Sequence, residues 1–407
     1  MLIVKKFGGS SIADAEKVFN VARRIAHSYD EGNDVVVVLS AQGDTTDDLI
    51  AKAKEINPKP SRREMDMLLS TGEQQAVALM AMALNSMGYS AISLNAHQVG
   101  MYTSSTYSNA RLRNIDTERV MAEIERKNIV LITGFQGMNR FDDITTLGRG
   151  GSDTTAVALA AALKANRCEI YTDVDGIYTA DPRAVESATK LSEVTYDEML
   201  ELASLGARVL HNRSVELAKK YHVELVVRSS LNYNEGTVVK EVCKMEKMLI
   251  SGVATDKDVA RISVIGVSDE PGIAFHLFRL LAKHKINVDI ILQSVGREGT
   301  KDITFTIAKD HLEETLQVLK ENQERLTFKE MAYDENVAKV SVVGAGMASN
   351  PGVAAKMFEA LYDAHINIQM ISTSEIKISV LIEEDKAKAA MNAIHDKFQL
   401  GNIKARR

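Results

Sequence analysis

The stretch that most constrains the fold is DVVVVLS, residues 34–40, an almost unbroken run of valine and other apolar residues. Such a run is typical of a strand buried on both faces, and strands of this kind belong to parallel sheets. Helical patterns lie before and after it, over residues 13–27 and 63–87. Strands that alternate with helices predict an α/β domain with a mostly parallel sheet. Further strands are expected at LIVKKF (2–7), AISLN (91–95), IVLIT (129–133), EIYTDV (169–174) and VELVV (223–227).

Polar loops follow four of the expected strands, after residues 7, 39, 133 and 174. Parallel strands end at one edge of their sheet, and ligands of open α/β sheets bind beyond that edge. We therefore expect these four loops to build one composite site. Their common position is a stronger argument for a site than any single motif.

The stretch TTLGRGGSDTTAVALAAAL, residues 145–163, joins a glycine loop to an expected helix. Ser152 and Asp153 stand where a helix N-cap is expected. Glycines let the backbone approach an anion, a helix N-terminus offers it amide groups, and Arg149 offers a planar fork. The negative charge of Asp153 indicates a cation as well: a metal ion, a lysine or an ammonium group. The alternative is a glycine turn that merely caps a buried helix.

Composition limits the function classes. The chain has 407 residues, enough for two or three domains, and a net charge of −6 without a basic stripe. This argues against nucleic acid as a partner, because phosphate neutralisation needs clustered Lys and Arg. No secretory signal and no apolar run long enough for a bilayer are seen, so we expect no membrane partner and a cytoplasmic protein. Cys168 and Cys243 lack metal or redox spacing and are expected to be core residues.

The C-terminal part contains an internal repeat with an offset of 80 residues, which follows a connection at residues 231–242. Pro271-Gly272 recurs as Pro351-Gly352, and Ile286-Asn287-Val288 recurs as Ile366-Asn367-Ile368. Each copy shows the order strand, PG turn, helix, strand, strand, helix, which predicts two small α+β domains. A strand-like piece at 248–255 is expected to complete the second copy.

The chain lacks a GxxxxGK[ST] phosphate loop, a protein-kinase motif set and zinc spacing. Residues 342–352 resemble a dinucleotide fingerprint, but Ser349 replaces its third glycine, so we favour a structural turn. The remaining groups suit phosphoryl transfer, which needs positioning and charge stabilisation rather than a protein nucleophile. Lys6 beside two glycines can neutralise a phosphoryl group, Arg149 can bind a carboxylate, Glu73 can bind an ammonium group, and Asp153 can orient Lys6 or Mg²⁺. For each residue taken alone, a solvated charge or an ordinary ion pair is about as plausible.

Several motifs together resemble the aspartokinase signatures of the amino-acid kinase superfamily, and the resemblance covers essentially the whole chain. The two repeats resemble the paired ACT domains of that family through SDEPG (268–272), INVDIILQS (286–294), SNPG (349–352) and ISTSEIKISVLI (371–382). The catalytic motifs are KFGGSS (6–11), SAQGDTTDDL (40–49), STGEQQA (70–76), GFQG (134–137), TTLGRGGSD (145–153), YTDVDGIYTADPR (171–183), MLELASLGARVLH (199–211) and VRSS (227–230).

The resemblance implies ATP-dependent phosphorylation of the β-carboxylate of L-aspartate to 4-phospho-L-aspartate, with Mg²⁺. This reaction is the first step towards lysine, threonine and methionine. The family also implies feedback control by lysine, threonine or both, and a homo-oligomer formed through ACT domains. A shorter regulatory chain that starts at Met245 or Met248 is a further expectation. The implied domains are an amino-acid kinase domain at 1–242, a first ACT domain at 259–335, and a second at 248–258 plus 336–407.

The resemblance also implies roles for individual residues, with no protein metal ligand among them. Lys6 and Asp153 are the expected catalytic pair. The expected aspartate-binding residues are Ser40, Thr46, Glu73, Arg149 and Ser152. The expected ATP-binding residues are Lys6, Gly8, Gly9, Ser10, Thr172, Asp173, Tyr178, Asp181 and Arg183. The expected effector-binding residues are Asp269, Gly272, Ala274, Asn287 and Gln293 in the first repeat, and Asn350, Val353, Asn367 and Ile368 in the second.

Two positions depart from the family pattern. Arg208 stands where some members have a lysine at the nucleotide phosphates, which puts its direct role in doubt. His211-Asn212-Arg213 replaces the usual HPR and is expected to loosen a turn without changing the chemistry. Two other functions remain open: a kinase of the same fold acting on glutamate, acetylglutamate or a nucleotide, and a non-catalytic amino-acid sensor. The paired ACT-like repeats and GRGGSD argue against the first, and intact Lys6, Glu73, Arg149 and Asp153 argue against the second.

Overall fold

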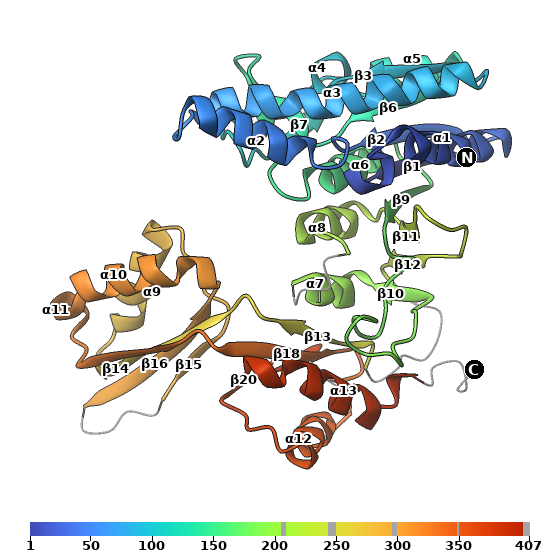
Figure 1. Ribbon diagram of the computed structural model, residues 1–407. Coiled ribbons are helices and arrows are strands. Elements are labelled where there is room, and N and C mark those ends of the chain that lie inside the picture. Colours follow the sequence, from blue (N-terminus) through green and yellow to red (C-terminus); the bar gives the residue numbers. More distant parts are fainter. Residues whose placement is uncertain (205–208, 243–249, 295–298, 348–349, 402–407) are drawn as a thin grey trace. The chain divides into compact units, whose positions relative to one another are not determined.

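The computed structural model describes residues 1–204, 209–242, 250–294, 299–347 and 350–401. They form two compact units (Figure 1). The first unit takes in residues 1–178, 190–204 and 209–242, and the second takes in residues 179–189 and the chain from 250 onwards. Residues 179–189 lie within the limits predicted for the kinase domain, yet they pack in the second unit. Four residues with expected roles lie outside the described residues: Arg208, Cys243, Met245 and Met248.

The first unit is built on a sheet that has eight strands in the described chain, in the order β10-β12-β11-β9-β1-β2-β6-β3. Neighbouring strands are parallel except β11 and β12, which are antiparallel. The mostly parallel α/β architecture predicted from the apolar runs is therefore confirmed. The strands are β1 (Leu2–Phe7), β2 (Asp34–Leu39), β3 (Ala91–Leu94), β6 (Ile129–Thr133), β9 (Arg167–Thr172), β10 (Glu193–Thr195), β11 (Leu225–Ser229) and β12 (Thr237–Lys240).

Two long helices cover one face of this sheet: α1 (Ala15–Asp30) and α3 (Arg62–Ser86). Alternate residues of β2, such as Val35 and Val37, pack with them in one core. The shorter helix α6 (Gly151–Ala162) packs against β1, β2 and β9. The remaining helical segments of the unit are η1 (Gly9–Ile12), α2 (Thr45–Ile56), α4 (Ala96–Val99), α5 (Glu118–Glu125), α7 (Tyr196–Ser204) and α8 (Asn212–Tyr221).

A small second sheet of the first unit carries the chain into α6. Its described strands run in the order β5-β4-β7-β8. They are β4 (Met101–Thr103), β5 (Leu112–Ile115), β7 (Gln136–Met138) and β8 (Ile144–Thr146). The glycine loop of residues 147–150 leaves β8 and leads directly into α6, so this sheet sets where the loop begins.

The second unit contains the two sequence repeats, and each forms an antiparallel sheet with helices packed on it (Figure 1). The sheet of the first repeat runs β15-β16-β14-β17, and the other runs β13-β18-β20-β19. The first repeat comprises β14 (Ala260–Ser268), α9 (Ile273–Lys283), β15 (Ile291–Gln293), β16 (Thr300–Ile307), η2 (Lys309–His311), α10 (Leu312–Glu321), α11 (Gln323–Leu326) and β17 (Glu330–Asp334). The second comprises β13 (Gly252–Asp256), β18 (Val337–Val343), α12 (Val353–Asp363), β19 (Met370–Thr373), β20 (Lys377–Glu383), η4 (Glu384–Lys386) and α13 (Ala387–Lys397).

The recurring Pro-Gly pair has the same structural role in both repeats. Gly272 and Gly352 are the N-cap residues of α9 and α12, with φ of 96° and 95°. Only glycine takes up this left-handed conformation without strain, which explains why the pair recurs. The strand-like piece before the first repeat contributes β13, which pairs antiparallel with β18 of the second repeat.

Residues 179–189, which we call the strap, form part of the core of the second unit. Ala180 and Val185 are buried in the same cluster as the side chains of α12 and α13. The amide of Val253 on β13 donates to the carbonyl of Thr179. His395 of α13 is fully buried, with Nε2 2.9 Å from Thr179 Oγ1. None of the described helices has the length and apolar character of a membrane span.

Candidate active site

The loops at the carboxyl edge of the large sheet are joined to one another by backbone hydrogen bonds. The amide of Ser40 donates to the carbonyl of Phe7 at 3.2 Å, and the amide of Gly134 donates to that of Leu39 at 2.9 Å. The amide of Ser230 donates in the same way to the carbonyl of Thr172. These bonds join β1 to β2, β2 to β6 and β9 to β11, and the ladder between β1 and β9 connects the two groups at one edge of the sheet.

Lys6 and Asp153 meet at this edge. Lys6 alternates along β1 with Phe7, which packs in the core under α1 and α3, so Lys6 projects towards the opposite face. There its Nζ lies 2.7 Å from Oδ1 of Asp153 in the first turn of α6. Both side chains are about one-eighth exposed, at 13% and 12%. The structure thus brings together the two residues predicted as the catalytic pair, with an ammonium group held at a helix N-terminus.

The glycine loop after β1 lies directly against the loop after β2. A Cβ on Gly9 would lie 2.3 Å from the carbonyl oxygen of Ala41, so no side chain fits at this position. The amide of Gly43 donates to the carbonyl of Gly9. Gly8 lies beside Lys6 Nζ, and Ser10 is exposed. The loop is therefore close-packed on one side and open on the other, as expected of a backbone that receives an anion.

The loop of residues 147–150 differs from the prediction in how it starts α6. The N-cap is Gly150, in the left-handed conformation with φ of 67° and without a side-chain capping bond. Ser152 and Asp153, expected at the cap, lie inside the first turn. Glycine is required at this cap, because the backbone is left-handed and a Cβ on Gly150 would lie 2.3 Å from Cβ of His211. The side chain of Arg149 is exposed and makes no hydrogen bond or ion pair with the described residues.

Ser152 packs against the loop that follows β6. A Cβ on Gly134 would lie 2.5 Å from Ser152 Oγ, so this glycine makes room for the serine. Ser152 is 8% exposed, which leaves its hydroxyl at the margin of the site. The first turn of α6 thus packs closely against the loop after β6.

Glu73 of α3 is buried beside the loop after β2. It is 3% exposed, and its Oε1 accepts a hydrogen bond of 3.2 Å from the amide of Ala41. Its Oε2 is buried and has no hydrogen-bond partner in the described chain. Burial raises the pKa of Glu73 to about 7, against the opposing effect of the backbone hydrogen bonds. A carboxylate in this condition is suited to a cationic partner from outside the chain.

Two further predicted substrate residues belong to the same region. Ser40 follows the last residue of β2, and Thr46 lies in the first turn of α2. Both are partly exposed, and they flank the segment that contacts Glu73 and Gly9. The five residues expected to bind aspartate thus lie after β2, in the first turn of α2, on α3, in the glycine loop of residues 147–150 and in the first turn of α6.

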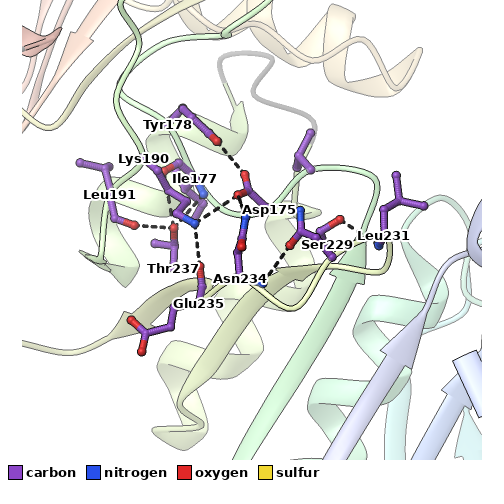
Figure 2. A network of polar contacts seen from close by, with 12 residues as sticks. Asp175, Ile177, Tyr178, Lys190, Leu191, Ser229, Leu231, Asn234, Glu235 and Thr237 are labelled. Atoms are coloured by element: carbon purple, nitrogen blue, oxygen red, sulfur yellow. Dashed lines mark hydrogen bonds and ion pairs between the residues drawn. The ribbon is translucent and has the colours of Figure 1, made fainter. Parts of the chain in front are cut away.

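The predicted nucleotide side centres on the chain after β9, shown in Figure 2. Thr172 Oγ1 accepts from the amide of Val174, and Asp173 is exposed. Tyr178 donates to Asp175 Oδ1 at 2.6 Å, and burial, together with this bond, raises the pKa of Tyr178 to about 12. Burial raises the pKa of Asp175, but hydrogen bonds from Tyr178, Asn234 and Lys190 outweigh it and hold that pKa below its usual range.

Asp175 and Thr237 were missed by the sequence analysis, although they organise this segment. Asp175 also accepts from Lys190 Nζ at 3.2 Å, so it binds both residues that border the strap (Figure 2). Thr237 is fully buried, accepts from the amide of Ile177, and donates to the carbonyl of Leu191. Asp175-Gly176 within the TDVDG motif is the only local signal for this network.

Asp181 and Arg183, predicted on the nucleotide side, lie in the strap and hence in the second unit. They form a two-point ion pair with each other, with Nη2 to Oδ2 at 2.9 Å, and the Arg183 side chain is 86% exposed. The structure does not bring them together with Thr172 and Tyr178 in one unit. Their assignment to ATP stays a prediction.

The predicted effector residues lie at matching places of the two repeats. Asp269, Gly272 and Ala274 surround the start of α9, and Asp269 pairs with Lys301 at 2.9 Å. Asn350 and Val353 surround the start of α12, and Asn350 donates to the carbonyl of Gly346. Asn287 follows α9, Gln293 lies on the exposed strand β15, and Asn367 and Ile368 lie between α12 and β19.

Comparison with known proteins agrees with this architecture. Residues 1–229 match the amino acid kinase family, and residues 260–324 and 340–398 each match an ACT domain. An aspartokinase of Bacillus sp. strain MGA3 is 51% identical over 400 residues, covering 98% of this chain and 97% of its own length.

Solved structures of a more distant protein share the fold over the whole length. E. coli aspartokinase III with aspartate and ADP matches at a TM-score of 0.82 and 25% identity, covering 98% of this chain and 99% of that one. The same protein with lysine and aspartate matches at 0.77, with the same identity and coverage. From this full-length similarity, and from a strand-edge site suited to phosphoryl transfer, the chain belongs to the aspartokinases and is an aspartate kinase.

Proposed function

We propose that this aspartate kinase transfers the γ-phosphoryl group of ATP to the β-carboxylate of L-aspartate, giving 4-phospho-L-aspartate for lysine, threonine and methionine synthesis. The observation that carries the proposal is the Lys6–Asp153 pair of 2.7 Å, placed between the glycine loop after β1 and the N-terminus of α6. The complex of E. coli aspartokinase III with aspartate and ADP supports the same two substrates.

Lys6 has the central catalytic role in this proposal. Its ammonium group neutralises the charge that develops on the transferring phosphoryl group, and amides of the glycine loop of Gly8, Gly9 and Ser10 bind phosphate oxygens. Asp153 keeps Lys6 in place, because an ion pair limits the rotamers of the long lysine side chain. The β-carboxylate of aspartate is itself the nucleophile, so the protein needs to position it and does not need to activate a side chain.

Aspartate binding is assigned first to two charged groups that have polar atoms without a partner in the described chain. The guanidinium of Arg149, which is exposed and unpaired in the described chain, binds a substrate carboxylate in a two-point contact. Glu73, whose Oε2 is buried without a partner, binds the substrate ammonium group. The hydroxyls of Ser40, Thr46 and Ser152 complete the site. On the nucleotide side, Thr172, Asp173 and Tyr178 belong to the first unit, and Asp181 and Arg183 belong to the strap.

The Mg²⁺ ion is assigned to the nucleotide rather than to a protein cage. No group of three or more His, Cys, Asp or Glu residues able to hold a metal occurs in the described parts of the chain. Mg²⁺ in kinases is commonly bound by substrate phosphates, water and one or two carboxylates. Asp153 is the predicted site residue that could contribute a carboxylate to Mg²⁺, but its Oδ1 already pairs with Lys6. Bound Mg²⁺ would supply charge neutralisation at the phosphates.

A coupled assay of ADP release tests the catalytic assignment. We expect release to depend on aspartate, and Lys6→Ala and Asp153→Ala each to lower kcat by at least about 10²-fold while the circular dichroism spectrum is retained. Lys17→Ala, which breaks an exposed ion pair on α1, is the matched control and should leave kcat unchanged. Equal ADP release with glutamate in place of aspartate would refute the substrate assignment, and near-normal turnover in either variant would refute its role.

We propose that lysine, threonine or both inhibit the enzyme through the ACT repeats. The lysine complex of E. coli aspartokinase III supports an amino-acid effector for this architecture. Activity is to be titrated with each amino acid singly and then with both together. Asn367→Ala and Gln293→Ala should weaken inhibition, because their amides are expected to bind the effector. If neither amino acid changes the activity, the effector assignment fails.

We propose that copies of the chain associate through the ACT sheets. β15 and β19 are edge strands in the described sheets and carry exposed apolar residues, among them Ile291, Leu292 and Ile371. Exposed apolar edges of this kind favour pairing with a second chain. Sedimentation of Ile291→Lys, compared with the parent, tests this: an unchanged mass would exclude β15 from the interface. A shorter regulatory chain and a cytoplasmic location stay predictions.

A further inference from the structure

The segment that carries Arg149 is held by two charged side chains from distant parts of the first unit. Asp66 lies on α3 and Arg213 lies in the first turn of α8. Neither belongs to the site predicted from the sequence. Both contact the same two backbone segments, residues 108–110 and residues 146–147. The second of these segments comes immediately before Gly148 and Arg149.

Asp66 is a fully buried carboxylate that accepts hydrogen bonds from backbone amides and hydroxyl groups. Its Oδ2 accepts from the amides of Ser108 and Thr146, each at 2.8 Å. Its Oδ1 accepts from the hydroxyls of the same two residues, at 3.2 and 2.9 Å. Burying a carboxylate carries a large desolvation cost, which four hydrogen bonds offset. The side chain therefore joins the two segments at one defined spacing.

Arg213 makes the equivalent connection through carbonyl groups. Its Nη1 donates to the carbonyl of Leu147 at 2.9 Å, and its Nη2 donates to that of Ala110 at 2.8 Å. Burial lowers the pKa of its guanidinium, with a smaller effect of Arg111. The planar fork of an arginine reaches two acceptors in fixed geometry, which a lysine cannot do.

The backbone polar groups of Thr146 and Leu147 are all hydrogen-bonded as a result. The carbonyl of Thr146 accepts from Ala110, and the amide of Leu147 donates to Phe135, each at 2.8 Å. Asp66 and Arg213 bind the other two groups. At the far end of the loop, Gly150 lies against His211. Arg149 thus projects from a short loop whose two ends are fixed.

We propose that Asp66 and Arg213 are positioning residues for the aspartate site: they set the direction in which Arg149 presents its guanidinium to the substrate carboxylate. The inference rests on the proposed role of Arg149. A displacement of a binding group by about 1 Å can lower activity by about 10²-fold. Arg213 therefore affects aspartate recognition, whereas the sequence analysis expected the His211-Asn212-Arg213 motif to leave the chemistry unchanged.

Steady-state kinetics of Arg213 variants provide the first test. Arg213→Met should raise KM for aspartate by at least about tenfold with a smaller change in kcat, and should leave KM for ATP within about twofold. Arg213→Lys should lie between the parent and Arg213→Met, because an ammonium group keeps the charge and donors but lacks the rigid fork that spans the two carbonyls. Arg111→Met, at an exposed neighbouring arginine, is the matched control. Equal increases in both KM values would show a general structural defect and overturn the proposal.

Variants of Asp66 test geometry separately from charge. In Asp66→Asn, the amide oxygen can accept from both backbone amides, and the amide nitrogen can donate to the two hydroxyls. We expect KM for aspartate to stay within about threefold in Asp66→Asn and to rise by at least about tenfold in Asp66→Ala. Equal defects in the two variants would overturn the positioning role. The Arg213 series decides the proposal if Asp66→Ala fails to fold.

A double-mutant cycle with Arg149→Ala separates this inference from the proposed function. If Arg213 acts through Arg149, Arg213→Met should change KM for aspartate by less than about twofold in the Arg149→Ala background. Multiplicative effects would overturn the inference and leave Arg149 as the substrate ligand. Unchanged KM in both single variants would overturn the role of Arg149 and the inference together, and unchanged KM in Arg213→Met alone would overturn only the inference.

Discussion

At the scale of single residues, the site depends on charged groups held in unequal environments. Lys6 and Asp153 satisfy each other at 2.7 Å, whereas Glu73 has one buried oxygen without a partner in the described chain. Arg149 has no polar partner there either. These two incomplete groups, one anionic and one cationic, match the ammonium and carboxylate of an amino acid. The paired residues, Lys6 and Asp153, thus have the proposed catalytic role. The residues with unpaired polar atoms, Glu73 and Arg149, have the proposed role in substrate binding.

The raised pKa of Glu73 predicts a pH dependence of aspartate use. Glu73 is ionised above its pKa of about 7 and neutral below it, and only the carboxylate attracts the substrate ammonium group. For the free enzyme, kcat/KM for aspartate should therefore be about tenfold lower at pH 6 than at pH 8. The pH profile of Glu73→Gln should lose this dependence. An identical profile in that variant would assign the titration to another group.

At the scale of elements, β1 and β9 are joined by a buried ion pair on the face opposite Lys6. Lys5 Nζ lies 2.6 Å from Glu169 Oε2, and both side chains are at most 5% exposed. Burial raises the pKa of Glu169, but Lys5, with smaller effects of Arg228 and Arg167, outweighs this and holds the pKa below its usual range. Because Lys6 is the next residue of β1, this pair fixes the strand that carries the proposed catalytic lysine.

Removal of one partner of the Lys5–Glu169 pair should be costly. Glu169→Gln leaves a buried ammonium group without its counter-charge and should lower the free energy of unfolding by about 3 kcal/mol, measured by urea denaturation with circular dichroism. The double variant Lys5→Met with Glu169→Leu should recover most of this loss. Lys219→Met, in an exposed pair with Asp197, is the control and should change stability little. Equal stability of Glu169→Gln and the parent would show that the pair does not secure β1 to β9.

At the scale of the whole molecule, the strap is a segment of the second unit that begins and ends in the first unit. It leaves the first unit after Tyr178 and returns at Lys190, and both residues bind Asp175 (Figure 2). Between these points its side chains are part of the core of the second unit, where Val185 is fully buried. A rearrangement of that core on effector binding would therefore act on the segment that follows the predicted nucleotide residues Thr172 and Asp173.

Loosening the strap should weaken inhibition by the amino-acid effector. Val185→Ala removes packing within the second core, so we expect the effector concentration for half-inhibition to rise several-fold while the uninhibited rate changes by less than about twofold. Val264→Ala in the first repeat is the control, because it removes the same two methyl groups at an equally buried site away from the strap. The same loss of inhibition in both variants would indicate general destabilisation rather than a role of the strap.

Local patterns in the sequence were sufficient for much of the fold. The valine run at 34–39 predicted a strand buried within a parallel sheet, because only such a strand tolerates apolar residues on both faces. The repeated Pro-Gly pair predicted two similar domains, and both glycines have the left-handed φ that explains the repeat. The polar loops at strand ends predicted one composite edge, where Lys6 meets Asp153. The predicted helix start was wrong by two residues or more: the cap is the left-handed Gly150, which packs against His211, a residue about 60 positions away along the chain.

The sequence by itself determined the parallel sheet, the duplicated domains, and the residue types gathered at the strand ends, since each depends on neighbours within a few residues. Only the tertiary structure decided that Asp66 and Arg213 bracket the Arg149 loop, that Lys5 pairs with Glu169, and that the strap packs with β13 and α13. Each of these contacts joins residues more than 40 positions apart. A contact at that separation leaves no periodic pattern in the chain, and it exists only because the packed sheet and helices bring its two sides together.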